Sequence, residues 1–474
     1  MSNIYKQGDN RKQQMFFPPS IDEYVGEDNQ VRAIDDYVEL LDVAKLGFTN
    51  ATLLSTDGQP AYHPKLLLKI YIYGYINKVR SSRKLEQEID RNIETMWLCA
   101  GLRPRYKTIA NFRKDNATAL KKVFREFVLL CKELDLITGE LVAVDGAFLR
   151  ANASKNKLIT KKTVVQDLKS IDSKIEEYLQ ALSFADKEEK KDKALKPLPT
   201  NNIPKMTKRK AKLDKDLALL EEIGVTQYNR TDPDAKLMIK PAHNLMAYNV
   251  QIAVDKKYKF IVVTNVSSDR NDVKQLPSIA SECKEVLGKD KLKIAADTGY
   301  YSAVNIKACI DKNITIFVPA QKNNKQKKKG LFENSKFHYD TNRDVYICPN
   351  NQELKKALCT QKRGDRLNFV YRGTSSMCNA CTLRDKCLAK KTAQKSIYRW
   401  EHQEIIEQHI LTMNTEEAKE AIKQRSALAE HPFGTIKQTL GWSHFLVRGK
   451  EKVSGENALI MFTYNFKRML NLIG

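Results

Sequence analysis

The chain has 474 residues, of which 81 are Lys or Arg and 57 are Asp or Glu, so its formal net charge is +24. Hydrophobic residues make up 42% of the chain and charged residues 29%, which excludes a wholly disordered or fibrous protein and predicts a globular one of roughly two to four domains. Such a positive excess favours a polyanionic partner, above all nucleic acid, because cationic side chains displace the counterions of phosphates. A lysine-rich composition that serves only solubility is the alternative.

The amino terminus and the cysteines indicate the compartment. Residues 1–20 lack the apolar core of a secretory signal, and no run of about 18 apolar residues could span a bilayer. We therefore expect a cytoplasmic protein with no membrane partner. The nine cysteines are unevenly spaced and five lie between Cys348 and Cys387, which is unlike a secreted disulfide framework and points to metal binding.

Residues 1 to about 135 are predicted to be helical, because their apolar positions recur at intervals of three and four. Residues 81–116 contain two short helix candidates separated by a Gly/Pro turn, and the second candidate is basic. One interpretation is a helix-turn-helix laid against DNA, and the other is an ordinary helical hairpin with a solvated basic face. On the first interpretation the DNA-binding residues are Arg105, Lys107, Arg113 and Lys114.

The pattern changes to β at residue 141. Apolar strands are predicted at 141–149, 247–255, 260–269, 291–297 and 313–320, with helices after the third and fourth of them. This order describes an α/β sheet of mixed direction. Charged helical segments at about 154–225 predict an antiparallel helical insertion, either a solvated arm or a DNA clamp. A cysteine-bearing module follows at 335–395, and helical texture returns after it.

Two carboxylates stand at the ends of predicted buried strands. Asp145 and Asp297 each follow an apolar run and are followed closely by Gly. The carboxyl edge of an α/β sheet is where ligands and metals gather, although a single such Asp is often only a turn or cap residue. Carboxylate oxygens are ligands of hard divalent cations, and two such ions about 3.5–4 Å apart can activate a water or a DNA 3′-hydroxyl. The pair therefore predicts a Mg²⁺ or Mn²⁺ site that needs a third acid.

Glu430 is the candidate for the third acid. On a helix, Lys437 returns to nearly the same face as Glu430, and Arg425 lies about a turn and a half before it. An acid between cations can bind metal while its neighbours hold phosphate, and the alternative is an exposed acid in surface ion pairs. Pro432 is expected to end or kink the helix at this point.

The carboxy-terminal cysteines have the spacing of a metal site. A C-x2-C pair lets two thiolates hold one tetrahedral Zn²⁺, and a closed set of four sulfur ligands implies a structural role. Cys359 is an alternative ligand, and unliganded reduced thiols are the competing interpretation. The predicted Zn²⁺ ligands are Cys348, Cys378, Cys381 and Cys387.

Four segments in chain order resemble the signature blocks of the DDE transposases of bacterial insertion sequences: VAVDGAFLRANASKNK, HNLMAYNVQIAVD, ADTGYYS and EHPFGTIK. The resemblance covers almost the whole chain. It implies a ribonuclease-H-like mixed sheet flanked by helices, with Asp145, Asp297 and Glu430 as the metal-binding catalytic triad. It also implies that Arg425 and Lys437 contact DNA phosphates. Tyr300 matches its block as well, with a stacking or phosphate-binding role, and half-buried packing is the alternative.

The resemblance predicts an organisation and a function. Residues 1–135 would be a DNA-binding domain, residues 136–334 and 396–474 the catalytic domain, and residues 335–395 a zinc module. We expect a Mg²⁺- or Mn²⁺-dependent transposase that binds the terminal inverted repeats of an insertion sequence, cleaves there and joins the ends to target DNA. It would act as a homodimer on double-stranded DNA in the bacterial cytoplasm, at the nucleoid. The alternatives are a non-catalytic DNA-binding regulator derived from a transposase, and a nuclease without strand transfer.

Overall fold

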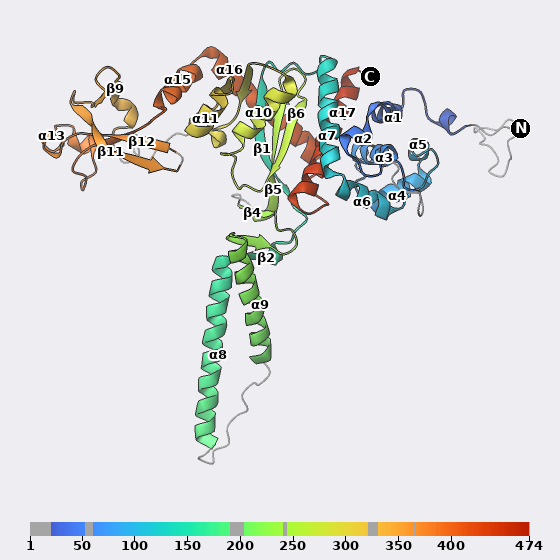
Figure 1. The fold of residues 1–474 in the computed structure, drawn as a ribbon, viewed down its shortest axis with the longest axis horizontal. Helices are drawn as coiled ribbons and strands as arrows, with labels where there is room; N and C mark the ends of the chain where they lie inside the picture. Colours follow the sequence, from blue (N-terminus) through green and yellow to red (C-terminus); the bar gives the residue numbers. More distant parts are fainter. Residues whose placement is uncertain are drawn as a thin grey trace, which may run out of the picture.

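The computed structural model describes residues 20–52, 60–189, 203–239, 244–320, 330–364 and 366–473. It contains a helical amino-terminal region, a central sheet between helices, a long helical hairpin that projects from the body, and a second small sheet beyond the far end of the first (Figure 1). The chain is thus a mixed α/β protein, as predicted. Within these ranges, none of the helices is both long and apolar enough to cross a membrane.

The amino-terminal region is helical, as its periodicity predicts. The first helix candidate of residues 81–116 is two helices, because Asn92 ends one and caps the next with its side chain. A short 3-10 turn, η1 (Ile21–Tyr24), precedes the helices. The helices are α1 (Gln30–Leu40), α2 (Val43–Leu46), α3 (Pro64–Ile76), α4 (Ser82–Arg91), α5 (Ile93–Leu98), α6 (Tyr106–Asp115) and α7 (Ala117–Glu133).

The central sheet has the order β4-β5-β1-β7-β8, with β6 paired to β5. The pairs β1–β5, β4–β5 and β5–β6 are antiparallel, whereas β1–β7 and β7–β8 are parallel, which confirms the predicted mixed direction. The parallel strands are connected through α10 (Leu276–Leu287) and α11 (Ala303–Ile310). The strands are β1 (Val142–Arg150), β4 (Lys236–Ile239), β5 (Asn244–Asp255), β6 (Ile261–Ser267), β7 (Leu292–Ala295) and β8 (Ile314–Phe317).

Helix α16 (Glu416–Gly434) crosses one face of this sheet. Its small residues allow close packing, with Ala421 against Ala295 of β7 and Ala429 against Ala143 of β1. Pro432 lies inside α16, two residues before the helix ends at Gly434, so the helix does not end at Pro432 itself. The other expectation, a kink at Pro432, stays a prediction. The chain passes from α16 directly into a π-helical turn at Thr435–Thr439.

A helical hairpin interrupts the sheet region after β1. Strands β2 (Leu158–Thr160) and β3 (Gln227–Asn229) pair antiparallel at its base, and α8 (Lys161–Glu189) and α9 (Ile203–Glu222) project from them, away from the rest of the molecule (Figure 1). Apolar side chains including Val164 and Leu220 pack at the base, and ion pairs such as Arg209–Asp167 join the helices farther out. The predicted antiparallel helical insertion is therefore present.

The second sheet has the order β13-β12-β11-β10-β9 and is antiparallel throughout. It has its own small core, in which Phe337, Tyr346 and Tyr371 pack together. Helix α15 (Gln403–Met413) leads back from this sheet to α16. The remaining elements are β9 (His338–Asp340), β10 (Val345–Ile347), β11 (Glu353–Arg363), β12 (Arg366–Arg372), α13 (Ser375–Asn379), α14 (Arg384–Cys387) and β13 (Ser396–Trp400).

Helix α17 (Lys450–Ile473) joins the amino-terminal helices to the sheet, because it packs against both α7 and β6 (Figure 1). Gly455 permits the closest approach: a Cβ atom there would lie 2.5 Å from the Cα of Ala117 on α7. Any larger residue at this position would push the two helices apart.

A buried carboxylate, Glu456, lies at the same junction and is fully buried. Its Oε1 accepts a hydrogen bond from the Tyr75 hydroxyl at 3.2 Å and lies 3.8 and 3.7 Å from guanidinium nitrogens of Arg80 and Arg113. Its Oε2 accepts hydrogen bonds from the backbone N–H groups of residues 446–447, at 2.8 and 3.1 Å. Glu456 therefore ties the amino-terminal helices to the loop that follows the π-helical turn.

Arg113 is consequently a core residue. It is only 6% exposed, and its guanidinium also donates to the Tyr75 hydroxyl at 3.1 Å and to the carbonyl oxygen of Arg80 at 3.3 Å. The prediction that Arg113 faces DNA is wrong, because a guanidinium held by a buried carboxylate and two further acceptors is not available to phosphates.

Candidate active site

The parallel pairing of β1 and β7 sets Asp145 beside Asp297. Ala143 is in register with Ala295, and each acid stands two residues farther along its own strand direction. Asp297 therefore follows the end of β7, as predicted, whereas Asp145 lies within β1, which continues to Arg150. The two acids lie side by side where β7 ends and β1 continues.

The glycines that follow the two acids orient their carboxylates. The backbone N–H of Gly146 donates to Asp145 Oδ1 at 2.8 Å, and that of Gly299 donates to Asp297 Oδ1 at 2.8 Å. The second interaction caps the 3-10 turn η3 (Thr298–Tyr300). Each carboxylate thus has one oxygen fixed by a local backbone donor.

Burial opposes the ionisation of Asp145. Burial raises the pKa of Asp145 to about 6; the Gly146 N–H and Arg425 lower it, while the charges of Asp297 and Asp272 raise it further. Arg425 reaches this carboxylate from α16, with Nη1 3.9 Å from Asp145 Oδ1. Carboxylates that repel one another in a partly buried position are a donor set that fits a hard divalent cation, and Mg²⁺ is often held by only one or two carboxylates plus substrate phosphates.

Asp272 and two amides form a polar network that the sequence analysis missed. The Asn249 amide donates to Asp272 Oδ1 at 2.8 Å and the Gln251 amide donates to the same oxygen at 2.6 Å. Asn249 and Gln251 are fully buried although they lie in the otherwise apolar strand β5. That alternation of amides within a buried strand is the signal that could have indicated the network.

Tyr300 belongs to this network rather than to the surface. It is 1% exposed, and its hydroxyl donates to Gln251 Oε1. Burial raises its pKa, and the charges of Asp272, Asp145 and Asp297 raise it further. The prediction that Tyr300 stacks on DNA or binds phosphate is wrong, because the ring lies inside the fold behind the acids.

Glu430 lies on the exposed side of α16. Its carboxylate accepts a hydrogen bond from the Ser426 hydroxyl one turn earlier. Glu430 follows Arg425 by five residues, which places it about 140° around the helix from the side chain that reaches Asp145. Among the described residues, no three His, Cys, Asp or Glu side chains are grouped so that they could hold a metal ion. The structure thus brings together two of the three predicted acids, with Asp272 nearby, and the role of Glu430 stays a prediction.

A basic hollow of about 510 Å³ opens at the far end of β1. Lys437, Arg150 and Lys155 come to it from the π-helical turn, from β1 and from the segment after β1, and Phe148 contributes an aromatic wall. Phe148 is three residues beyond Asp145, so the hollow begins roughly 10 Å along the strand from the acid. The predicted Lys437 therefore lies on a surface suited to phosphates, at the far end of the strand that carries Asp145.

The remaining predicted DNA-binding residues are exposed on or beside α6. The Arg105 side chain is 82% exposed and lies 3.6 Å from Glu86, and the Lys114 side chain is 54% exposed. Lys107 is exposed as well. These three cations are accessible to a large ligand, unlike Arg113.

The four predicted zinc ligands line one small cavity of about 30 Å³ in the second sheet region. The backbone N–H of Gln352 donates to Cys348 Sγ at 3.4 Å. Burial raises the pKa of Cys387; Lys395 lowers it, and the other three thiols of the cavity raise it. Four thiols that line one cavity fit Zn²⁺ in the type and number of ligands. Among the described residues, however, these side chains are not grouped so that they could hold a metal ion as they stand. Cys359 is exposed on β11, away from the cavity.

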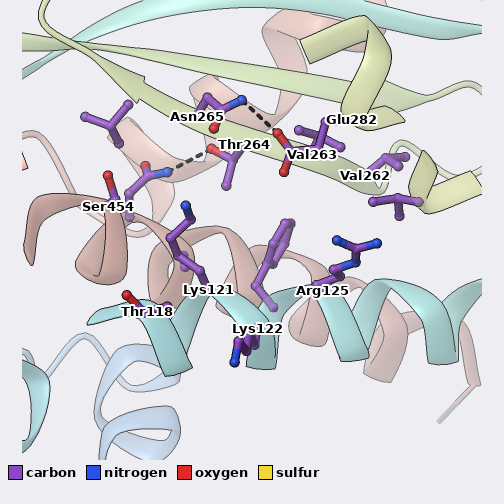
Figure 2. A pocket seen from close by; sticks show the side chains of 15 residues that line it. Thr118, Lys121, Lys122, Arg125, Val262, Val263, Thr264, Asn265, Glu282 and Ser454 are labelled. Atoms are coloured by element: carbon purple, nitrogen blue, oxygen red, sulfur yellow. Dashed lines mark hydrogen bonds between the residues drawn. The ribbon is translucent and has the colours of Figure 1, made fainter. Parts of the chain in front are cut away.

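A separate hollow of about 210 Å³ lies between α7, β6, α10 and α17 (Figure 2). Its walls are held by hydrogen bonds from Asn265 to Glu282 and from Asn457 to Thr264, and Lys121 extends into it from α7. None of the predicted site residues lines it. It marks the junction between the amino-terminal helices and the sheet and is separate from the acid pair.

Two family models match the chain. The model described as a transposase DDE domain matches residues 347–470, and a model described as a transposase domain (DUF772) matches residues 19–115. The first match includes Glu430, whereas Asp145 and Asp297 lie outside both. Both models describe transposase domains, so the two matches support a DDE transposase, and residues 116–346 lie outside them.

The search of curated proteins gave no match. Among solved structures, the piggyBac transposase in a synaptic complex with hairpin DNA is similar to this chain at 11% sequence identity and a TM-score of 0.30. The alignment covers 93% of this chain and 72% of that one.

Proposed function

We propose that the protein cleaves DNA at the terminal inverted repeats of an insertion sequence and joins the freed 3′ ends to target DNA. The observation that carries this proposal is the placement of Asp145 within β1 beside Asp297, which follows the end of the parallel strand β7, in a chain that matches a transposase DDE domain. The mixed sheet with α16 across one face also supports a ribonuclease-H-like core, with catalytic residues in 136–334 and 396–474 and DNA-binding residues in 1–135.

In this proposal Asp145 and Asp297 hold Mg²⁺ or Mn²⁺, and Glu430 is the third acid. A bound ion would supply activation of a water or 3′-hydroxyl and stabilisation of the leaving oxygen. The chain's own residues orient the site: the N–H groups of Gly146 and Gly299 fix one oxygen of each Asp. Arg425 offsets part of the carboxylate charge before the ion binds.

The decisive test is a cleavage and strand-transfer assay with DNA that carries the ends of the element, in Mg²⁺ or Mn²⁺. Metal-dependent nicks at the ends followed by joined products support the proposal. Cleavage without joining indicates a nuclease, and binding without cleavage indicates a regulator derived from a transposase. All three predict salt-sensitive binding of double-stranded DNA, so binding alone decides nothing.

The basic hollow gives a prediction about DNA affinity. We expect Lys437→Ala and Lys155→Ala each to weaken DNA binding and to reduce the slope of log affinity against log salt by about 1, because each lysine neutralises about one phosphate. Fluorescence anisotropy over a salt series measures this slope. Lys256→Ala is the matched control, since Lys256 follows β5 at the other end of β1 and pairs with Glu140. An unchanged slope in both hollow variants would remove this surface from the DNA path.

The cysteine cavity gives a prediction about zinc. We expect the purified protein to contain about one Zn²⁺ per chain, and Cys381→Ser to lose the metal and lower the thermal stability of the second sheet region. Cys359→Ser should retain the metal, because Cys359 is exposed outside the cavity. Elemental analysis together with thermal unfolding measures both effects. A wild-type protein that contains no zinc and is not stabilised by added zinc would contradict this prediction.

The assembly and the compartment follow from the same proposal. Two ends of one element must be held together for coupled joining, so we propose a homodimer on DNA. The protein would act in the bacterial cytoplasm at the nucleoid. The molar mass of the complex with DNA that carries the ends of the element tests whether two chains bind together.

A further inference from the structure

The polar side chains behind the acid pair form a continuous relay of hydrogen bonds. The Tyr300 hydroxyl donates to Gln251 Oε1, and Gln251 Nε2 donates to Asp272 Oδ1 at 2.6 Å and to Asn249 Oδ1 at 3.0 Å. Asn249 Nδ2 donates to Asp272 Oδ1 at 2.8 Å. An ionised carboxylate can only accept hydrogen bonds, so Asp272 fixes which way both amides face.

The relay connects the two segments that bear the acids. Tyr300 ends the turn that Asp297 caps, whereas Gln251 lies on β5 directly opposite Gly146, the neighbour of Asp145. The backbone pairing of β1 with β7 stops at Ala143 and Ala295, two residues before the acids. The backbone hydrogen bonds between β1 and β7 therefore do not reach Asp145 and Asp297. The relay of side chains connects the two segments beyond that point.

The relay has little room to move. Asn249 and Gln251 are fully buried and Tyr300 is 1% exposed. A Cβ atom on Gly146 would lie 2.3 Å from Gln251 Nε2 and 2.7 Å from Asp272 Oδ1, so the amide and the carboxylate are packed directly against the β1 backbone. A shift of Asp272 must therefore be transmitted to Gln251 and from there to the turn that holds Asp297.

We propose that Asp272 is a positioning residue that sets the separation of the Asp145 and Asp297 carboxylates through Gln251 and Tyr300. This inference rests on the proposed function of the acid pair. Asp272 acts as a hydrogen-bond acceptor, and its negative charge is secondary. An Asn at position 272 can present its own Oδ1 to the same two amide donors, whereas an Ala cannot.

The test compares Asp272→Ala, Asp272→Asn and Tyr300→Phe in the metal-dependent cleavage assay. We expect Asp272→Ala and Tyr300→Phe to lower kcat by about 100-fold, because a displacement of about 1 Å at reacting groups has an effect of this size. The KM for DNA should stay the same, and the Mn²⁺ concentration needed for half-maximal rate should rise. Asp272→Asn should restore most of kcat.

Two neighbouring residues supply matched controls. Asp269 lies in the same loop but bonds to Ser267 and Gln275, and Tyr301 follows Tyr300 but lies outside the relay. Asp269→Ala and Tyr301→Phe should leave kcat unchanged. If Asp272→Asn is as damaging as Asp272→Ala, Asp272 acts through its charge and the inference is overturned. It is also overturned if Tyr300→Phe cleaves at the wild-type rate.

A second measurement separates this inference from the proposed function. Amide hydrogen exchange of residues 297–301 reports on the turn without any catalysis. Asp272→Ala and Tyr300→Phe should accelerate exchange there relative to Tyr301→Phe, whether or not the wild-type protein cleaves DNA. If the wild-type protein does not cleave DNA but the two variants still exchange faster at residues 297–301, the proposed function is contradicted and the relay is supported. Unchanged exchange in both variants would remove the relay.

Discussion

Asp145→Asn should lower the rate of metal-dependent cleavage by at least about a thousandfold, beyond the roughly 10–100-fold typical of residues that only support a metal ligand. The amide keeps the size of the side chain but loses the negative charge that would hold the ion beside Asp297. Affinity for end DNA should remain or increase slightly, because a carboxylate makes no favourable contact with phosphates. Gel-based cleavage and binding assays on the same DNA measure both quantities.

The same substitution should stabilise the metal-free protein. Burial raises the pKa of Asp145 from its ordinary value of 3.8 to about 6, so the folded state binds this proton more tightly than the unfolded state. The stability that this proton contributes is fully present below the pKa of Asp145 in the unfolded state, and it is lost as the pH rises through about 6. At pH 8 Asp145 is therefore ionised in a position that disfavours its charge. A pKa change from 3.8 to about 6 corresponds to at most about 3 kcal/mol in the free energy of unfolding, and the partial exposure of Asp145 reduces this contribution. Thermal unfolding between pH 5 and pH 8 should show the advantage of Asp145→Asn growing with pH.

Asp290→Asn is the control, because Asp290 is exposed in the turn before β7. It should cleave normally and show no such pH-dependent gain. Added Mg²⁺ should stabilise the wild-type protein and this control but not Asp145→Asn. Cleavage by Asp145→Asn at more than a few per cent of the wild-type rate would exclude Asp145 from the chemistry.

Glu456→Ala should lower the free energy of unfolding by about 3–5 kcal/mol, because it leaves the buried guanidinium groups of Arg80 and Arg113 without their counter-charge. Arginine cannot relieve this by losing its proton. The backbone donors of residues 446–447 would also lose their acceptor. Urea unfolding followed by tryptophan fluorescence measures the change, since Trp442 is buried against Tyr75 beside this network.

An exposed residue of the same helix gives the baseline. Glu451→Ala should change stability by no more than about 0.5 kcal/mol. Combining Glu456→Leu with Arg113→Leu should recover part of the loss, because replacing both members of a buried pair is less harmful than removing one. A loss below about 1 kcal/mol in Glu456→Ala would mean that the two arginines are solvated in solution.

The strand pattern was enough to predict the sheet and the acid pair. Apolar runs that lead to Asp145 and Asp297 are local features, and the parallel register of β1 with β7 places residues that follow these runs side by side. Contacts between residues far apart in the sequence could not be predicted from local patterns. Arg113 looked like a surface cation because its helix is short and basic, and its counter-charge Glu456 comes from the last helix of the chain.

The polar network shows the same limit. Asp272 stands in the same loop as Asp269, and nothing local distinguishes the acid that accepts from buried amides from the acid that accepts from Ser267 and Gln275. Tyr300 matched a family block, but a block does not reveal whether a side chain points outward or inward. Pro432 was expected to end or kink α16, whereas the helix continues two residues past it and is followed by a π-helical turn.

The helical hairpin of α8 and α9 works mechanically as a lever. Helix α8 has 29 residues, so at about 1.5 Å per residue its far end stands roughly 44 Å from the β2–β3 base. A rotation of about 10° at that base would swing the far end through about 8 Å, more than the spacing of two base pairs. Seven residues separate the end of β1 from β2, so the base of this arm is attached close to the strand that carries Asp145.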